Sequence, residues 1–372
     1  MMKGIVFTEN GVEVSDELEV AAPGPKQVKV NVMAAGVCHS DVSVINGTIP
    51  WKPPAVLGHE GAGIVAEVGS EVTSVKPGDH VVIATLANCG VCRACSSGHP
   101  TWCMRSLGNV SQPFTYKGQP ASNFAAVSVF VESTIISEIQ AIKIPDDVPF
   151  ASACLIGCGV LTGVGAVLNR AKVRPGETAA VFGVGGIGLN VIQGLDIAGA
   201  TRIVGVDMLA SKEGLAREFG ATDFIDASKE DAVARIHELI PMNSESAAGA
   251  LSPFGGVTYS FDCVGHAAVL RNALDVLDWG GTAVAIGIPP QGTEVGVDIN
   301  ALAYVDRTLM GCRYGSARPH QDVPLMVDLY RSGKLKLDEL VTMKRPIDGF
   351  QEIIDAMHEG KVARGVLEIG AL

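Results

Sequence analysis

The sequence predicts an α/β protein in which a β-rich N-terminal half precedes a doubly wound parallel sheet. Two observations lead to this prediction. Residues 1–85 contain short runs rich in Val and Ile, separated by Gly, Pro, Asn and Asp, which is the pattern of strands and turns. From about residue 155 onwards, strand-like and helix-like segments alternate, which is typical of βαβ units.

Length and composition agree with such a fold and exclude other classes of protein. At roughly 150 residues per domain, the 372 residues predict two domains. Apolar residues make up 47% and charged residues 18%, which is too apolar for a disordered chain. The 44 glycines do not recur every third residue, so the chain is not collagen-like. A net charge of -12 predicts that the protein binds neither nucleic acid nor anionic membranes.

The cysteines direct attention to metal binding. The N-terminal MMKGIVFTEN lacks an apolar signal-peptide core, and no window reaches about 20 uninterrupted apolar residues. We therefore expect a cytoplasmic protein. Because cytoplasmic thiols are normally reduced, clustered cysteines indicate metal ligation or catalysis before disulfides.

The elements are expected in the following order. The first half should contain strands at 28–37, 62–70 and 78–85, a Cys- and Gly-rich loop at 88–119, and further strands up to 145. The second half should contain a strand–turn–helix–strand unit at 178–207, a strand at 260–265, a helix at 267–277 and a strand at 282–288. Residues 241–256 should form an irregular insertion, and 323–333 and 349–360 should be helices.

The first cluster of candidate ligands is Cys89, Cys92, Cys95 and Cys103. Four thiolates supply the closed tetrahedral shell of a structural zinc ion. The alternative is an iron–sulfur cluster, but in the bacterial ferredoxin pattern three residues separate the last two cysteines and a proline follows the last one. Here seven residues separate Cys95 from Cys103, and Met104 follows Cys103. The spacing therefore favours structural zinc.

A second candidate set is dispersed along the chain. Cys38 lies in GVCHSD, His59 and Glu60 in GHEGAG, and Cys158 in IGCGV. Two cysteines and one histidine match the three protein ligands of a catalytic zinc with an open fourth position. Glu60 can bind when substrate is absent, and Asp41 can orient the His59 ring. The spacing alone does not distinguish this set of metal ligands from a structural histidine and ordinary buried, apolar cysteines.

A third pattern indicates dinucleotide binding. VFGVGGIGLN contains G-x-G-x-x-G at Gly183, Gly185 and Gly188, between a strand and a helix, as the Rossmann fingerprint requires. The pyrophosphate of a dinucleotide would lie at the helix N-terminus, beside Gly186 and Ile187. Asp207 ends the next strand, where a carboxylate accepts ribose hydroxyls and favours NAD over NADP, and Lys212 is placed to reach the same ribose.

Together these stretches resemble the zinc-dependent medium-chain alcohol dehydrogenases over nearly the full length. The resemblance is greatest to the branch with class I and class III enzymes and their actinobacterial relatives. Its motifs are the four-Cys lobe and GVCHSD, VLGHEGAGIVAEVG, VKPGDHVV, IGCGVLTGVGA, VFGVGGIG and GVDMLASK. The resemblance implies a GroES-like catalytic domain at 1–159 and 315–372, interrupted by a Rossmann NAD-binding domain at 160–314.

The resemblance also implies roles for single residues. Cys38, His59 and Cys158 would hold a catalytic zinc with Glu60 beside it, so that each chain binds two zinc ions. Ser40 fills the position whose hydroxyl bonds the alcohol and passes its proton on. His39 and Arg364 would contact the cofactor pyrophosphate; the alternative for Arg364 is a solvent-facing charge. The implied reaction is reversible hydride transfer between a primary or secondary alcohol and NAD.

Departures from the family pattern bear on the substrate. Ser43 replaces the histidine that ends the proton relay in several animal members. Class III enzymes have acidic residues at the positions of Ile49 and Trp51 and an arginine at that of Leu107, where they bind a glutathione adduct. Glutathione-dependent formaldehyde oxidation is therefore not expected. The expected pocket for a neutral alcohol consists of Ile49, Trp51, Thr85 and Phe124.

Two other functions stay open at this point. In the first alternative, the same zinc- and NAD-dependent reaction would oxidise a formaldehyde adduct of another thiol, such as mycothiol. A protein of a different class would bind NAD and zinc without catalysis, which the intact set of Cys38, Ser40, His59 and Cys158 disfavours. The resemblance further implies a homodimer or homotetramer, with dimerisation through the edge of the Rossmann sheet near 300–314.

Overall fold

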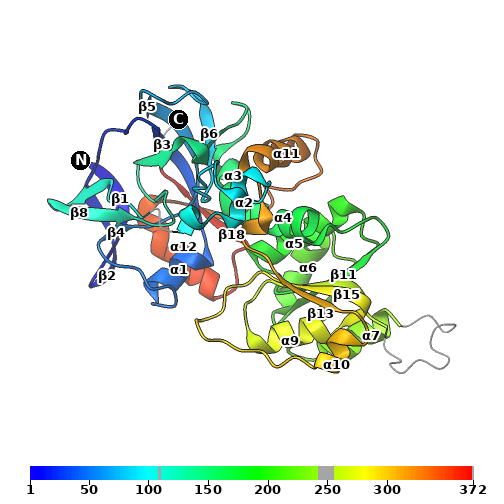
Figure 1. The fold of residues 1–372 in the computed structure, drawn as a ribbon. Helices are drawn as coiled ribbons and strands as arrows, with labels where there is room; N and C mark the ends of the chain where they lie inside the picture. Colours follow the sequence, from blue (N-terminus) through cyan, green and yellow to red (C-terminus); the bar gives the residue numbers. More distant parts are fainter. Residues whose placement is uncertain (108–109, 242–254, 371–372) are drawn as a thin grey trace. The chain divides into compact units, whose positions relative to one another are not determined.

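The computed structural model describes residues 1–107, 110–241 and 255–370 (Figure 1). The described chain divides into two compact units, one formed by Met1–Leu161 with Ala317–Leu372 and the other by Thr162–Ser316. The second unit begins and ends two residues after the domain boundaries expected from the sequence. The expected insertion at 241–256 lies almost entirely outside the described residues.

The first unit contains a small closed barrel. Its strands are β1 (Met2–Thr8), β2 (Gly11–Val20), β7 (Phe114–Tyr116), β8 (Gln119–Asn123) and β4 (Ala55–Val56). Val6 of β1 and Leu18 of β2 are fully buried and pack beside Phe114 of β7. The barrel therefore has its own apolar core.

A seven-stranded sheet forms the rest of this unit and carries the candidate metal ligands. Its order is β10 (Ala141–Lys143), β6 (His80–Ile83), β5 (Glu60–Val68), β3 (Gln27–Val37), β18 (Arg364–Glu368) and β17 (Val341–Pro346), and β9 (Ser133–Ser137) also pairs with β3. Strand β6 lies within the run expected at 78–85, whereas β3 and β5 begin one and two residues before the runs expected at 28–37 and 62–70. The pairing of β18 with β3 brings the C-terminal part of the chain beside its N-terminal part. Helices α11 (Pro319–Arg331) and α12 (Phe350–His358) follow in the C-terminal segment.

One helical run, Phe150–Ala171, links the two units. It comprises α3 (Phe150–Leu155), the π-helical turn Ile156–Val160, α4 (Leu161–Gly165) and a second π-helical turn, Ala166–Ala171. Its 22 residues are long and apolar enough to cross a membrane, but 83% of its most apolar window is buried inside the structure. That burial is typical of the core helix of a globular protein. Single-turn π segments are frequent at functional sites, and Cys158 lies in the first one.

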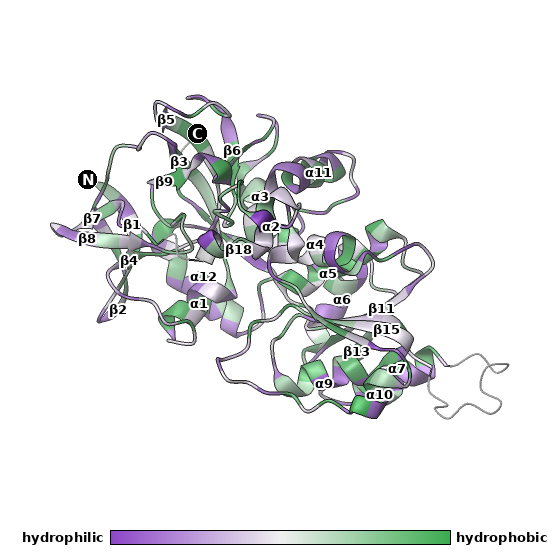
Figure 2. Cartoon of the chain, in the orientation of Figure 1, coloured by the Kyte–Doolittle hydropathy of each residue, from purple (hydrophilic) through white to green (hydrophobic). Residues whose placement is uncertain are grey.

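The second unit has a six-stranded sheet in which every pairing is parallel. The strand order is β13 (Asp223–Asp226), β12 (Arg202–Asp207), β11 (Thr178–Phe182), β14 (Val257–Asp262), β15 (Leu277–Ala285) and β16 (Thr308–Gly311). The order reverses between β11 and β14, and dinucleotides bind at such a switch point. The helices are α5 (Gly186–Ala198), α6 (Glu213–Glu218), α7 (Ala232–Leu239), α9 (Ala267–Asp275) and α10 (Ile299–Ala303). In Figure 2, helices α7 and α9 carry both hydrophobic and hydrophilic residues, as amphipathic helices do.

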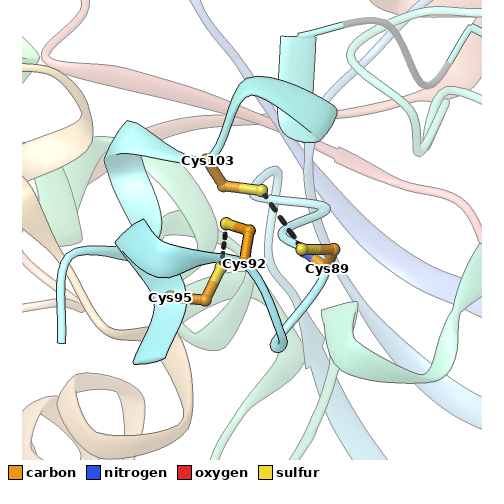
Figure 3. Close-up of side chains that lie close together, drawn as sticks. All are labelled: Cys89, Cys92, Cys95 and Cys103. Atoms are coloured by element: carbon orange, nitrogen blue, oxygen red, sulfur yellow. Dashed lines mark hydrogen bonds between the residues drawn. The ribbon is translucent and has the colours of Figure 1, made fainter. Parts of the chain in front are cut away.

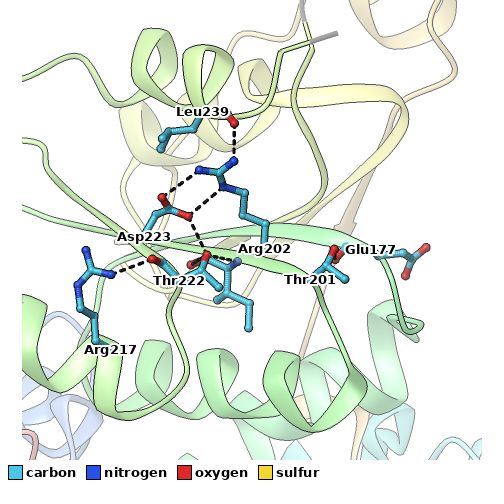
Figure 4. Close-up of polar contacts among 8 residues, drawn as sticks. Glu177, Thr201, Arg202, Arg217, Thr222, Asp223 and Leu239 are labelled. Atoms are coloured by element: carbon cyan, nitrogen blue, oxygen red, sulfur yellow. Dashed lines mark hydrogen bonds and ion pairs between the residues drawn. The ribbon is translucent and has the colours of Figure 1, made fainter. Parts of the chain in front are cut away.

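A polar clamp joins the N-terminal ends of β12 and β13 (Figure 4). The Arg202 guanidinium donates through Nε and Nη2 to both carboxylate oxygens of Asp223, at 2.9 and 3.1 Å, and through Nη1 to the Leu239 carbonyl. The hydrogen bonds from Arg202 lower the pKa of Asp223. All donors of this clamp point at protein acceptors, so we assign it a structural role.

Candidate metal and cofactor sites

Four side chains with metal-binding atoms come together from segments that are distant in the sequence. Cys38 directly follows β3 and precedes α1 (His39–Ile45). His59 and Glu60 lie where β5 begins, beside β3. Cys158 comes from the first π-helical turn. One ligand atom of each residue lies within 4.8 Å of those of the other three.

Asp41 connects the segments that carry Cys38 and His59. It is fully buried, and its Oδ2 accepts a hydrogen bond from the Cys38 backbone N–H at 3.0 Å. Its Oδ1 accepts the Gly58 backbone N–H at 3.2 Å and lies 3.1 Å from His59 Nδ1. Because a carboxylate can only accept, Nδ1 carries the proton of this bond and Nε2 keeps the lone pair that a metal requires.

Replacing the carboxylate of Asp41 should therefore weaken metal binding without removing a ligand. For Asp41→Asn we expect zinc affinity or kcat/KM to fall roughly 10- to 100-fold, the effect typical of such supporting partners. Chelator competition measures the affinity. The control is Asp79→Asn, because Asp79 is also a buried aspartate of this unit but pairs with Lys143. Equal zinc affinities and rates in the two variants would contradict the role assigned to Asp41.

Glu60 and Arg364 form a buried pair beside the cluster. Glu60 is fully buried, and its Oε1 lies 3.4 Å from Nη1 of Arg364, which is 4% exposed. A Cβ at Gly36 would clash with Glu60 Oε2, and one at Gly159 would clash with Arg364 Nη2. The two glycines thus make the space that this pair occupies. Burial raises the pKa of Glu60 to about 7, against the opposing charge of Arg364.

The donor set of this cluster suits a catalytic zinc ion. Two thiols and an imidazole are the preferred zinc ligands, and the structure adds a carboxylate next to them. Neither oxygen of that carboxylate has a hydrogen-bond partner in the described chain, and Oε2, which does not pair with Arg364, is available to a cation. The hydrogen bond with Cys158 lowers the pKa of Cys38 well below that of a free thiol, which favours the thiolate that binds metal.

The four-Cys cluster is contained within one short lobe of the chain (Figure 3). Cys92 is the N-cap of α2 (Arg93–Ser96), and Cys95 lies within this short helix. Cys89 lies shortly before α2, and Cys103 follows a short 3-10 helix (Pro100–Trp102). The Sγ atoms of Cys92 and Cys95 are 3.5 Å apart, and those of Cys89 and Cys103 are 3.7 Å apart. All four thiols are free of disulfides.

These sulfur separations fit zinc. With Zn–S bonds of about 2.3 Å, the edges of a tetrahedron are roughly 3.8 Å long, close to the measured distances. Backbone hydrogen bonds from Val91 and Cys92 lower the pKa of Cys89 to about 6, whereas burial raises the pKa of Cys95 to about 11. The prearrangement of the lobe for a closed site with four cysteine ligands therefore rests on the sulfur positions.

The glycine fingerprint lies at the carboxyl end of β11, where α5 begins. Gly185 caps α5, and a side chain at this position would meet no atom within 4 Å, which leaves room for a ligand to approach the backbone. A Cβ at Gly188 would clash with the Gly183 carbonyl, so the third glycine permits close helix–strand packing. Gly186 and Ile187 form the first turn of α5, whose N-terminus suits a pyrophosphate.

Asp207 ends β12 next to this turn. Its Oδ2 accepts hydrogen bonds from the Val184 backbone N–H at 2.8 Å and from Lys212 Nζ at 2.9 Å. The structure therefore brings both predicted ribose-binding side chains together at the glycine turn. Since the site presents a carboxylate to the ribose, it fits NAD better than the 2′-phosphate of NADP.

The remaining predicted site residues lie in the first unit. Ser40 Oγ is 3.9 Å from Cys38 Sγ, and His39, the first residue of α1, is exposed. Phe124 packs edge-on against His59, with ring centroids 5.4 Å apart, and against Trp51 at 5.1 Å. Ile49 packs against the same apolar core. Thr85 is half-buried just after β6.

Comparison with known proteins identifies the family. The family model of the alcohol dehydrogenase GroES-like domain matches residues 24–146, and that of the zinc-binding dehydrogenase matches residues 186–332. The chain is 39% identical to the S-(hydroxymethyl)glutathione dehydrogenase of Paracoccus denitrificans over 94% of its length and 95% of that protein. The chain belongs to the zinc-dependent medium-chain alcohol dehydrogenases. The class-3 alcohol dehydrogenase of Cereibacter sphaeroides is 40% identical over the same shares.

Solved structures of alcohol dehydrogenases share the whole fold. The alcohol dehydrogenase zinc-binding domain protein of Burkholderia ambifaria superposes with a TM-score of 0.91 at 33% identity, covering 100% of this chain and 99% of its own. The benzyl alcohol dehydrogenase of Acinetobacter calcoaceticus has a TM-score of 0.91 at 30% identity, covering 99% of both chains. These findings confirm the predicted GroES-like and Rossmann folds and an NAD-dependent, zinc-containing alcohol dehydrogenase.

Two features of this dehydrogenase were not predicted from the sequence. Gly36 and Gly159 make the space for Glu60 and Arg364, and such a close approach between side chains has no local sequence signal. The sequence also left a solvent-facing position open for Arg364, whereas the structure buries this guanidinium against Glu60. No local sequence pattern shows this burial, because it follows from the pairing of β18 with β3 beside the metal ligands.

Proposed function

We propose that the catalytic zinc is held by Cys38, His59 and Cys158, with Glu60 as an additional ligand when no substrate is bound. The single observation that carries this proposal is the convergence of these four side chains within 4.8 Å. Cys89, Cys92, Cys95 and Cys103 hold the structural zinc. Zinc at the first site supplies a Lewis acid for the alcohol oxygen, and bound NAD supplies the hydride acceptor.

The chain's own residues position the reactants and move the proton. Ser40, 3.9 Å from the Cys38 sulfur, takes the hydroxyl proton of the alcohol and passes it outward, where Ser43 stands in place of the histidine of several animal members. Asp41 fixes the ring of His59. The cofactor is held by the glycine turn at its pyrophosphate and by Asp207 and Lys212 at its ribose, and His39 and Arg364 are assigned to the pyrophosphate.

We propose that the substrate is a neutral alcohol with an apolar or aromatic substituent. Phe124 lies between His59 and Trp51, so an apolar surface begins directly beside a proposed metal ligand. Ile49 and Thr85 extend the proposed pocket without adding charge. The fold similarity to a benzyl alcohol dehydrogenase points in the same direction.

Trp51 provides the test of this pocket. Burying an aromatic side chain contributes about 1.5–3 kcal/mol, so Trp51→Ala should raise KM for benzyl alcohol roughly 10- to 100-fold. The same change should affect ethanol much less, and Leu325→Ala, at an exposed position of α11, should affect neither. An unchanged KM for benzyl alcohol in Trp51→Ala would contradict the assigned pocket.

A thiol adduct of formaldehyde is the second candidate substrate, because the two relatives named above are an S-(hydroxymethyl)glutathione dehydrogenase and a class-3 alcohol dehydrogenase. The two candidate substrates are distinguished by whether NADH formation requires a thiol. We expect NADH from neutral alcohols without any thiol. Activity that appears only with formaldehyde together with glutathione or mycothiol would establish the thiol-dependent reaction instead.

We also propose a cytoplasmic homo-oligomer whose dimer forms through the edge of the second unit's sheet. Strand β16 is the last strand of this sheet, and among the described strands it pairs with β15 alone. Exposed Leu309 on this strand and the contacting rings of Trp279 and Tyr304 add apolar surface near this edge. A free strand edge with apolar neighbours suits pairing with a second copy.

A further inference from the structure

Arg364 places a buried positive charge against the cluster of Cys38, His59, Glu60 and Cys158. This arginine begins β18, is 4% exposed, and its guanidinium stays protonated in proteins. Because Gly365 pairs with Val37 at the end of β3, the backbone of Arg364 lies beside that of Cys38. A Cβ at Gly159 would clash with Nη2, so the guanidinium also packs against the first π-helical turn. The charge thus contacts two of the segments that carry the cluster.

Glu60 is the only carboxylate within ion-pair distance of this guanidinium in the described chain. The 3.4 Å between its Oε1 and Arg364 Nη1 is longer than the roughly 2.7–2.9 Å of a strong charge-assisted hydrogen bond. Among the described residues, neither oxygen of Glu60 has a hydrogen-bond partner, and Nε and Nη2 of Arg364 have none either. The pair is therefore held mainly by its opposite charges, and no third group fixes the carboxylate in place.

The carboxylate of Glu60 lies between two possible cations. One of its oxygens is within 4.8 Å of a ligand atom of each cysteine and of the histidine in the cluster. A catalytic zinc keeps its fourth position for water or substrate, and an anionic carboxylate at that distance competes with the substrate for the position. The positive charge of Arg364 attracts the same carboxylate from the other side.

We propose that Arg364 is a positioning residue that weakens the hold of Glu60 on the metal, so that an incoming alcohol can displace the carboxylate. The inference rests on the ligand set proposed above. Without the guanidinium, the metal is the only cation left to the carboxylate, which then closes the fourth position. This role is distinct from the pyrophosphate contact assigned to Arg364, because it operates in the absence of cofactor.

Imidazole tests the proposal as a neutral ligand of the fourth position, without NAD. It is titrated into enzyme that carries cobalt(II) instead of zinc, because the visible spectrum of cobalt(II) changes with its ligands. The closed four-cysteine site has no position for imidazole, so the change reports the Cys38–His59–Cys158 cluster alone. A nearby opposite charge shifts carboxylate equilibria by about 1–3 pK units. We therefore expect R364M to bind imidazole more weakly by roughly tenfold or more.

Glu60 provides the decisive comparison. An amide is a poorer metal ligand than a carboxylate, so R364M/E60Q should bind imidazole within a few-fold of the wild type, which loss of packing at Arg364 would not explain. The control is R202M, because Arg202 also pairs with a carboxylate, that of Asp223, but in the second unit. This control should bind imidazole like the wild type.

The cobalt content, two ions per chain, shows which variants are intact. Should R364M fail to fold, R364Q, which also lacks the charge, carries the same expectation. Unchanged imidazole affinity in the intact variant would overturn the proposal, as would a weakened affinity that E60Q does not restore. An equal loss in R202M would overturn it as well. A wild type that binds no metal at the Cys38–His59–Cys158 cluster would instead refute the ligand set, and this proposal with it.

Discussion

Cys158→Ser is expected to bind one zinc ion per chain instead of two and to lose alcohol oxidation. Serine is a poor zinc ligand compared with a thiolate, and the cluster then has only Cys38, His59 and Glu60 to hold the ion. Lewis-acid stabilisation of the transition state contributes several kcal/mol. At about 1.4 kcal/mol per tenfold change, kcat/KM for an alcohol should fall by roughly 10³ or more.

Elemental analysis and the rate of NADH formation measure the two effects. Cys154→Ser is the matched control, because Cys154 is a fully buried cysteine one helical turn before Cys158 and its Sγ bonds the Ala151 carbonyl instead of joining the cluster. We expect this control to keep both zinc ions. A Cys158→Ser enzyme with two zinc ions and wild-type turnover would refute the assigned ligand set.

Cys103→Ser should have the opposite pattern, with a large loss of stability and a small loss of activity. Cys103 is fully buried, and its sulfur is one of only four that close the lobe. Because a structural zinc contributes its binding energy to folding, we expect the loss of one zinc ion and of about 4 kcal/mol of unfolding free energy. For a unit of this size that corresponds to roughly 8–16 °C in Tm.

Thermal unfolding and zinc content measure the change, and kcat/KM at low temperature shows whether the active site survives. Since Cys103 is not among the catalytic ligands, kcat/KM should stay within a few-fold of the wild type. Cys312→Ser, at a buried cysteine of the second unit, should keep both zinc ions. An unchanged Tm with two zinc ions in Cys103→Ser would refute a structural zinc in the lobe.

The two metal sites differ in how far the sequence predicts them. The lobe cysteines fall within fifteen residues, so their spacing alone indicates a closed zinc site. Cys38, His59 and Cys158 meet only because β3 pairs with β5 and the π-helical turn adds the last ligand. Such long-range packing leaves no local pattern, and only the surrounding family motifs made this site predictable.

The fold shows the same division between local and long-range signals. The βαβ alternation predicted strands β11, β12 and β14 and helix α9 close to their observed bounds, because each is a continuous apolar or amphipathic run. The closure of the barrel by β4 and the place of β18 beside β3 depend on contacts between distant residues. The π-helical turn at Cys158 likewise has no signature in an apolar, glycine-containing helix.

An anomalous difference map, measured at the zinc absorption edge on crystals of the purified enzyme, tests the central claim most directly. We expect two peaks per chain. One should lie between Cys38, His59 and Cys158, and the other between Cys89, Cys92, Cys95 and Cys103. The absence of a peak at the Cys38–His59–Cys158 cluster, or a zinc ion coordinated by other residues, would contradict the assigned ligands.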